Sequence, residues 1–292
     1  MHIHGSICAL ATPFGDDGAV DLDAFERLVG YQLEHGTQAL VVAGSTGEAH
    51  MLSDGEFSRL VQHAVQQVNG RVPVIAGCGS AATRQTIAAC RQVAELGVDA
   101  ALVVTPYYVR PDQRGLEHHF RSVADDGSLP IILYNVPSRT ACDMLPETVA
   151  ALRDHPRIIG IKEAVSDSER IRAMSDLASD DFVFLSGDDG TAVDAMLAGA
   201  SGTVSVVANA VPRLFRAACD AALEGNRELA AEARQRLQPL LAALGCAPNP
   251  VPIKACLAAL DICLEHVRSP LLPLPDDGAR QRLRELTVSL QA

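Results

Sequence analysis

The sequence is poor in aromatic residues and in lysine. It contains no tryptophan, and aromatic residues make up 4% of its 292 positions. Lysine occurs only at Lys162 and Lys254, although lysine and arginine together number 24. Arginine therefore carries most of the positive charge, which indicates a compositional bias against lysine. A lysine that persists under such a bias is a candidate for a specific role.

Three further absences narrow the class of protein. The formal net charge is −12, so no excess of basic residues is present to gather nucleic-acid phosphates or anionic lipids, and we expect neither partner. There is no run of eighteen apolar residues and no basic, apolar leader in residues 1–14, so we expect a cytoplasmic protein without a membrane span. The eight cysteines show no CxxC pair or zinc-ligand spacing, which predicts reduced thiols and no metal site.

Most of the sequence alternates between strand-like and helix-like stretches. Short β-branched apolar runs alternate with stretches of helical periodicity. We expect strands at 6–10, 39–43, 72–76, 100–104, 131–134, 158–162, 182–186 and 203–206. Helices are expected between them at 22–35, 54–69, 83–96, 113–124, 146–153, 168–178 and 191–197. Eight such units predict an α/β fold, the closed (β/α)8 TIM barrel, and 48% hydrophobic content suffices for its core.

From about residue 211 the pattern is helical only. Helical periodicity covers 211–223, 227–244, 251–264 and 278–290. We therefore predict that residues 1–225 form the barrel and that residues 226–292 form a C-terminal helical region packed on it.

Polar residues follow the predicted strands at their C-terminal ends, where barrels of this type collect their reactive groups. These ends carry GSTGE (44–48), TPYY (105–108), Tyr134-Asn135 with nearby Arg139, Lys162-Glu163, Gly187-Asp188-Asp189 and Asn209. Hydroxyl groups, one lysine and one arginine are thus expected to meet at one edge of the barrel, without histidines or a plausible metal cluster.

Lys162 is the candidate for covalent chemistry. Because side chains alternate along a strand, we expect Lys162, Gly160 and Ile158 to share one face, where Gly160 would leave room for a small keto acid. An apolar pocket disfavours the ammonium and frees the lone pair that attacks a carbonyl. The protonated imine formed with pyruvate is an electron sink, and its enamine can add to an aldehyde. The alternative is a rim lysine whose amine extends into water.

The residues near Lys162 favour the chemical interpretation. Tyr107, Tyr108 and Tyr134 follow strands, where phenols can move protons or pack amphipathically, the role we expect for Tyr107. Ser45 and Thr46 stand between glycines and can form a carboxylate cradle, although such residues also make ordinary turns.

Two other strand ends leave alternatives open. Arg139 follows a Pro-Ser pair and can hold a second carboxylate, or can be a solvated surface residue. Asp188 and Asp189 could bind a cation, but helix capping is the simpler interpretation.

The stretches VTPYYVRP, ILYNVPSRT, IGIKEA and LSGDD together resemble the dihydrodipicolinate synthase and N-acetylneuraminate lyase family of pyruvate-dependent class I aldolases. The resemblance runs from Gly5 to Lys254. It implies a Schiff base on Lys162 without a separate cofactor, and Tyr134 as general acid and base. It also implies pyruvate contacts by the following residues: Ser45, Thr46, Gly187 and Val204.

Within that family the resemblance favours the synthase branch, which condenses pyruvate with L-aspartate 4-semialdehyde in diaminopimelate and lysine biosynthesis. Arg139 matches the residue that holds the aldehyde's carboxylate. Tyr134, Ser45 and Tyr108 match a proton relay in which Tyr108 reaches the neighbouring subunit, which implies a homotetramer of tight dimers. The alternatives are N-acetylneuraminate lyase, a 2-keto-3-deoxy sugar-acid aldolase, or a catalytically silent homologue.

The sequence departs from the synthase pattern at two places, and each departure predicts a change in behaviour. Ser45 replaces a threonine and loses the methyl group that restrains its rotamer, so we expect activity with a looser relay. The positions that correspond to the lysine-feedback pocket match only at Tyr107, which predicts weak or absent inhibition by lysine. The other positions there are Ala49, His50, Asp54, Phe57, Ala81 and Gln85.

Overall fold

The computed structural model describes residues 3–291, in which eight parallel strands close into a barrel. Each strand pairs with the next, and β8 returns to pair with β1. The strands are β1 (Gly5–Ala9), β2 (Ala39–Val42), β3 (Val74–Gly77), β4 (Ala100–Val104), β5 (Ile131–Asn135), β6 (Ile158–Glu163), β7 (Val183–Ser186) and β8 (Gly202–Ser205). The predicted (β/α)8 barrel is confirmed, and each predicted strand overlaps an observed one.

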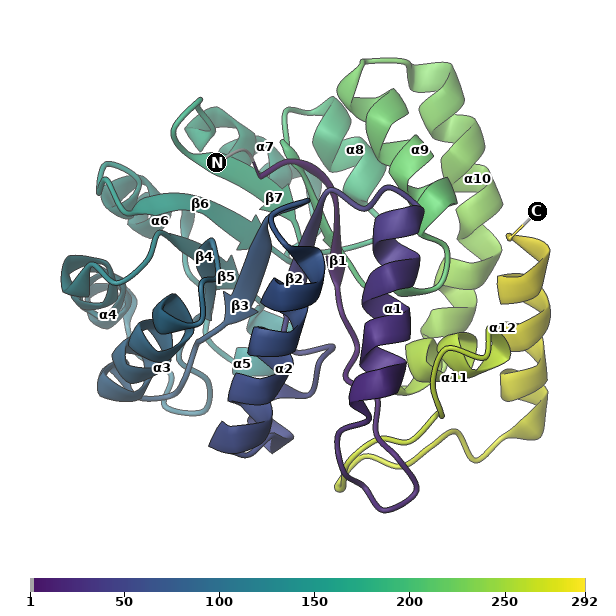
Figure 1. Ribbon diagram of the computed structural model, residues 1–292. Helices are drawn as coiled ribbons and strands as arrows, with labels where there is room; N and C mark the ends of the chain where they lie inside the picture. The colour runs from purple at the N-terminus through teal and green to yellow at the C-terminus, as the bar shows by residue number, and fades with distance from the viewer. Residues whose placement is uncertain (1–2, 292) are drawn as a thin grey trace.

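Helices surround the strands on the outside of the barrel (Figure 1). They are α1 (Leu22–Glu34), α2 (Asp54–Val68), α3 (Thr83–Glu95), α4 (Gln113–Asp126), α6 (Pro146–Leu152), α7 (Ser168–Leu177), α8 (Ala192–Leu197) and α9 (Pro212–Leu223). Three of them begin at aspartate caps whose carboxylates accept backbone N–H groups, at Asp21 (2.9 Å), Asp112 (2.8 Å) and Asp167 (2.9 Å).

The C-terminal helices gather on one side of the barrel, beside α9 (Figure 1). They are α10 (Arg227–Leu244), α11 (Val251–Ala259) and α12 (Asp277–Ser289). The predicted helix 251–264 is too long. It ends early because Asp261 adopts a left-handed conformation (φ +55°) and the Ile262 N–H turns back to the Leu257 carbonyl (3.1 Å). Three short helices were not predicted: η1 (Ala49–Met51), α5 (Pro137–Thr140) and η2 (Val207–Asn209).

Strand β6 contains an irregularity that decides which of its side chains enter the barrel. Ile131 of β5 pairs with Ile158, but Ile132 pairs with Gly160, so Ile159 is an extra residue. Ile158 consequently packs in the cluster between strands and helices, while Ile159 packs against the barrel interior. The expectation that Ile158 shares a face with Lys162 is therefore wrong, because the bulge shifts the alternation by one residue.

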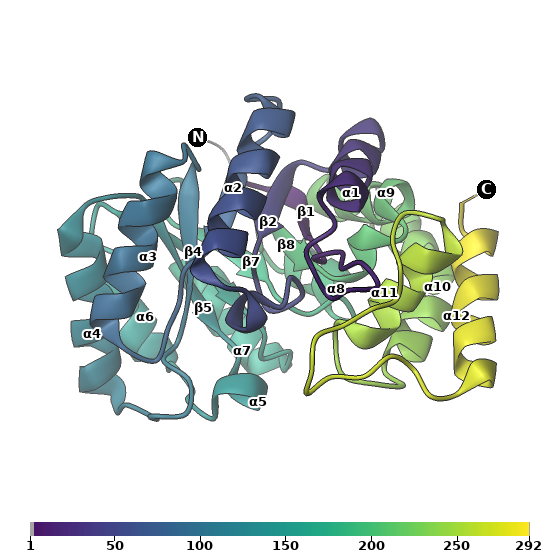
Figure 2. The same cartoon turned by 60° about the horizontal axis from the view of Figure 1, so that its bottom comes forward.

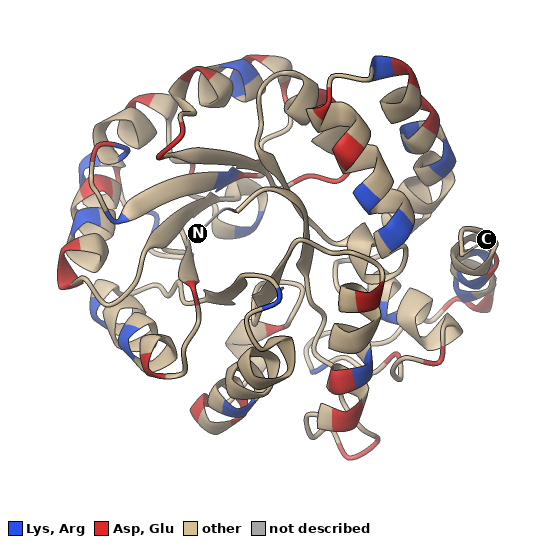
Figure 3. Ribbon diagram, turned by 45° about the horizontal axis from the view of Figure 1, so that its top comes forward, with Lys and Arg blue, Asp and Glu red and all other residues tan. Residues whose placement is uncertain are grey.

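Charged residues lie mainly on the outer helices and loops, where positive and negative residues are interspersed (Figure 3). The barrel interior is apolar and includes Ile7, Val41, Leu102, Leu185 and Val204. Within residues 3–291 no helix has the length and apolar character needed to cross a membrane.

Candidate active site

Lys162 lies at the C-terminal end of β6 with 7% of its surface exposed. It pairs across the sheet with Tyr134 of β5, and its Nζ lies 4.1 Å from the centroid of the Tyr134 ring. Within the described chain, this Nζ has no ion-pair or hydrogen-bond partner. The amine is therefore not committed to a fixed partner and is available to a substrate carbonyl.

Two glycines near this amine serve different purposes. A Cβ atom at Gly187 would lie 3.0 Å from the Lys162 Cε, so a larger residue would press on the lysine chain. A Cβ atom at Gly160 would lie 2.4 Å from the Val183 Cγ2 and 2.5 Å from the Val183 carbonyl oxygen. Gly160 therefore permits β7 to approach closely, and the predicted space for a keto acid beside it is filled by Val183.

The loop after β2 brings its hydroxyl groups to the same end of the barrel. Thr46 is buried, with 3% exposure, and Ser45 is half-buried. Ser45 and Tyr134 line one small pocket together with Leu102. Ser45 and Tyr134 thus lie on the same small pocket, as the convergence of strand ends predicts.

Asn249 connects this loop to Arg139. The Asn249 Nδ2 donates to the Thr46 Oγ1 (3.0 Å), and the exposed Arg139 donates through Nη2 to the Asn249 carbonyl (3.3 Å). Because Asn249 occupies an acceptor position of the Thr46 hydroxyl, the Thr46 proton is left to be donated elsewhere. Arg139 lies on α5 and Asn249 just precedes α11, both of which come forward in Figure 2.

Tyr108 does not reach this pocket within its own chain. It lies on the loop after β4, 91% exposed, with a left-handed backbone (φ +71°). Its neighbour Tyr107 turns elsewhere, with its ring centroid 6.1 Å from that of His50. Tyr107 and His50 line a second pocket that also includes Asp54 and Gln85, and His50 borders both pockets.

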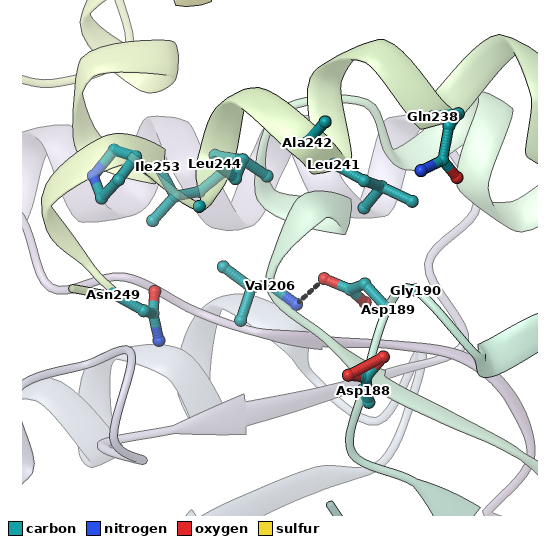
Figure 4. Close-up of a pocket in the computed structure, with 12 residues that line it drawn as sticks. Asp188, Asp189, Gly190, Val206, Gln238, Leu241, Ala242, Leu244, Asn249 and Ile253 are labelled. Atoms are coloured by element: carbon teal, nitrogen blue, oxygen red, sulfur yellow. Dashed lines mark hydrogen bonds between the residues drawn. The ribbon is translucent and has the colours of Figure 1, made fainter. Parts of the chain in front are cut away.

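Asp188 and Asp189, which follow Gly187, border a pocket of about 390 Å³ against α10 and α11 (Figure 4). Asp188 accepts from the Thr191 N–H (3.0 Å) just before α8, and Asp189 accepts from the Val206 and Val207 N–H groups (3.0 and 2.8 Å) at η2. Burial raises the pKa of Asp189. Both carboxylates therefore accept backbone N–H groups near the start of a helix, although neither aspartate is the N-cap residue of α8 or η2. The described residues contain no group of His, Cys, Asp and Glu suited to hold a metal ion.

A buried polar network on the other side of β6 from Lys162 was not predicted from the sequence. Glu163 is adjacent to Lys162 but points to the opposite face of β6, where its side chain is fully buried. It accepts from the Asn135 Nδ2 (3.1 Å) and the Arg170 Nη1 (3.0 Å), and Arg170 also donates to Asp143 (2.7 Å). Burial raises the pKa of Glu163, although the Asn135 and Arg170 contacts oppose that rise. The network therefore ties the ends of β5 and β6 together.

The chain matches the model of the dihydrodipicolinate synthetase family over residues 2–289. It is 54% identical to the 4-hydroxy-tetrahydrodipicolinate synthase of Xanthomonas axonopodis pv. citri (strain 306), over all of this chain and 97% of the relative. Its fold superposes with a TM-score of 0.96 on the chloride-inhibited dihydrodipicolinate synthase from Acinetobacter baumannii complexed with pyruvate. That structure is 38% identical, and the match covers 99% of each chain.

A third similarity is to the dihydrodipicolinate synthase from Cyanidioschyzon merolae with lysine bound. Its TM-score is 0.94 at 35% identity, covering all of this chain and 99% of the other.

Proposed function

The chain belongs to the dihydrodipicolinate synthetase family, and we propose that it acts as a 4-hydroxy-tetrahydrodipicolinate synthase through a Schiff base between Lys162 and pyruvate. The activity itself, that of a lyase, is the one its full-length relatives carry in their names. The observation that carries the mechanism is the buried, unpaired amine of Lys162 over the Tyr134 ring. No separate cofactor is needed, because the imine supplies the electron sink.

The pyruvate half of the reaction uses residues at the barrel mouth. Thr46 and Ser45 hold the carboxylate, and the Lys162 amine attacks the keto carbon. Tyr134 donates the proton with which the former carbonyl oxygen leaves as water, and the imine forms. Loss of a methyl proton then gives the enamine. Gly187 and Val204 border the bound ketone, since Gly187 abuts the lysine chain and Val204 faces the barrel interior.

The second substrate is L-aspartate 4-semialdehyde, as the family implies. Arg139 is exposed on α5 and holds the aldehyde's carboxylate by charge-assisted hydrogen bonds. The enamine carbon attacks the aldehyde carbon, whose oxygen takes up a proton and becomes the 4-hydroxyl group. The amino group of the adduct then attacks the imine carbon and displaces the Lys162 amine, which closes the ring and releases the free enzyme.

The assembly belongs to the same proposal. Tyr108 completes the relay of Tyr134 and Ser45 from a neighbouring subunit, which fits its 91% exposure and outward loop. Val109 beside it is also exposed, at 57%, and supplies apolar surface for that contact. We expect tight dimers paired into a cytoplasmic homotetramer, and sedimentation velocity measures the assembly.

Steady-state assays test the function. With pyruvate fixed, the protein is supplied with L-aspartate 4-semialdehyde, and product is followed by coupling to a reductase. In parallel, N-acetylneuraminate and a 2-keto-3-deoxy sugar acid are offered for cleavage, with released pyruvate measured by lactate dehydrogenase. We expect the condensation to exceed both cleavages by orders of magnitude in kcat/KM. Faster cleavage of either acid would reject the synthase in favour of an aldolase.

A further inference from the structure

The second lysine, Lys254 on α11, is fully buried, and its amine contacts three other groups. Its Nζ lies 2.5 Å from the Glu48 Oε1, donates to the His266 carbonyl (2.6 Å) and lies 4.1 Å from the centroid of the Phe14 ring. Lys254 and Glu48 both have side chains with 0% exposure. Lys254 is therefore unlike Lys162: its charge is matched by a carboxylate, and its amine is committed to fixed partners.

Glu48 is the last residue of the GSTGE loop, which also contains Ser45 and Thr46. It has a left-handed backbone (φ +53°), a conformation that glutamate rarely adopts without support. Its N–H donates to the Ser45 carbonyl (3.2 Å), so the position of Glu48 fixes the turn that presents the two hydroxyls. Its second carboxylate oxygen accepts from the Arg268 N–H (2.9 Å).

The same C-terminal segment holds the loop at a second point. Asn249 and Ile253, which precede Lys254 on this segment, border the pocket in Figure 4, and Asn249 donates to the Thr46 Oγ1 (3.0 Å). Lys254 thus fixes one end of the loop through Glu48, while Asn249 fixes Thr46. Thr12 holds the loop from the β1 side through its bond to the Gly47 carbonyl (2.7 Å).

We propose that the buried Lys254–Glu48 ion pair is a positioning device that sets the geometry of the pyruvate-carboxylate cradle. Neither residue is catalytic, since both act through Ser45 and Thr46. The inference rests on the proposed pyruvate chemistry of Lys162. A purely structural ion pair would contribute to stability but would leave the affinity for pyruvate unchanged in any variant that keeps the fold.

The test uses the double variant Glu48→Gln, Lys254→Met, which removes both charges and avoids leaving either one buried and unpaired. The full-length protein is incubated with increasing pyruvate and reduced briefly with borohydride, and the fraction of chain carrying an adduct at Lys162 is measured by mass spectrometry. We expect the half-saturating pyruvate concentration to rise at least tenfold, about 1.4 kcal/mol. The labelling at saturation should approach that of the wild type.

The control is Glu265→Gln, Arg280→Met. It removes another ion pair of the C-terminal segment (2.9 Å) that does not touch the loop, and its half-saturation should stay within twofold of the wild type. A folded Glu48→Gln, Lys254→Met variant with wild-type half-saturation overturns the inference. If that variant does not fold by circular dichroism, Glu48→Asp takes its place, and an unchanged half-saturation there overturns the inference equally. An absence of adduct in the wild type would instead reject the proposed function.

Discussion

Replacing Arg170 with methionine measures what the network behind Lys162 contributes to stability. The Arg170 side chain is 11% exposed, and that of its partner Glu163 is fully buried. The change removes hydrogen bonds to Glu163, Asp143 and the Met144 carbonyl, and it leaves the Glu163 carboxylate without a counter-charge. Breaking a buried ion pair in this way costs about 3–5 kcal/mol. At roughly 2 °C per kcal/mol for a chain of this size, Tm should fall by about 6–10 °C.

The loss of stability should depend on pH in a defined direction. Burial raises the pKa of Glu163, and removal of the Arg170 charge raises it further. A carboxyl group whose pKa is higher in the folded than in the unfolded state destabilises the fold as it ionises, so the cost grows as pH rises through the folded pKa. Asp143 acts in the same direction. Burial opposes the change, but Arg170 and Asn135 hold the pKa of Asp143 below its usual value, and that stabilisation exists only while Asp143 is ionised.

Thermal unfolding followed by circular dichroism at about pH 5 and about pH 8 tests the size of the Tm loss and the contribution of Glu163 to its pH dependence, because Asp143 in the wild type is ionised at both values. The difference in Tm between wild type and Arg170→Met should be larger at the higher pH. Arg234→Met is the control, because its ion pair with Asp194 is exposed (2.9 Å; 41% and 55%) and should contribute at most about 1 kcal/mol. A Tm for Arg170→Met that matches this control, or a difference that does not change with pH, would mean that Arg170 does not compensate a buried Glu163 charge.

Three further predictions concern the second substrate, the assembly and inhibition by lysine. Arg139→Ala should raise KM for L-aspartate 4-semialdehyde about 10- to 100-fold, because a charged hydrogen bond contributes about 1.5–3 kcal/mol. Labelling of Lys162 by pyruvate should be unaffected. Equal losses for both substrates would count against the role assigned to Arg139. Tyr108→Phe should keep the fold and lower kcat by about 100-fold or more. Co-expression of Tyr108→Phe with the inactive Lys162→Met should restore activity in mixed dimers, and no recovery would mean that Tyr108 does not serve the neighbouring subunit. L-Lysine should inhibit weakly or not at all, because the pocket at His50 and Tyr107 departs from the feedback pattern; strong, saturable inhibition at low concentration would contradict this.

The barrel could be predicted from sequence because its signals are local and repeated. Each strand is a short apolar run that ends in polar residues, and strand ends of a parallel barrel meet at one edge, which places Lys162, Tyr134, Ser45 and Thr46 together. The error at Ile158 arose because a bulge adds one residue without a sequence signature. The helix that ends at Ala259 was overextended because apolar periodicity continues past the left-handed Asp261.

Residues that join distant segments could not be predicted. Asn249 contacts Thr46 across 203 positions, and Lys254 contacts Glu48 across a similar separation. Neither pairing leaves a local pattern, since only the folded chain brings α11 against the loop after β2. Arg170 was missed for the same reason, because a surface arginine on a helix looks the same in sequence whether or not a buried carboxylate faces it.

Covalent trapping with borohydride tests directly whether Lys162 forms the Schiff base with pyruvate. The protein is reduced with borohydride in the presence of pyruvate, digested and mapped by mass spectrometry, and its two lysines make the assignment unambiguous. We expect one reduced pyruvate adduct, on Lys162, with Lys254 unmodified and no adduct in Lys162→Met. An unlabelled chain, or a label on Lys254, would contradict this expectation.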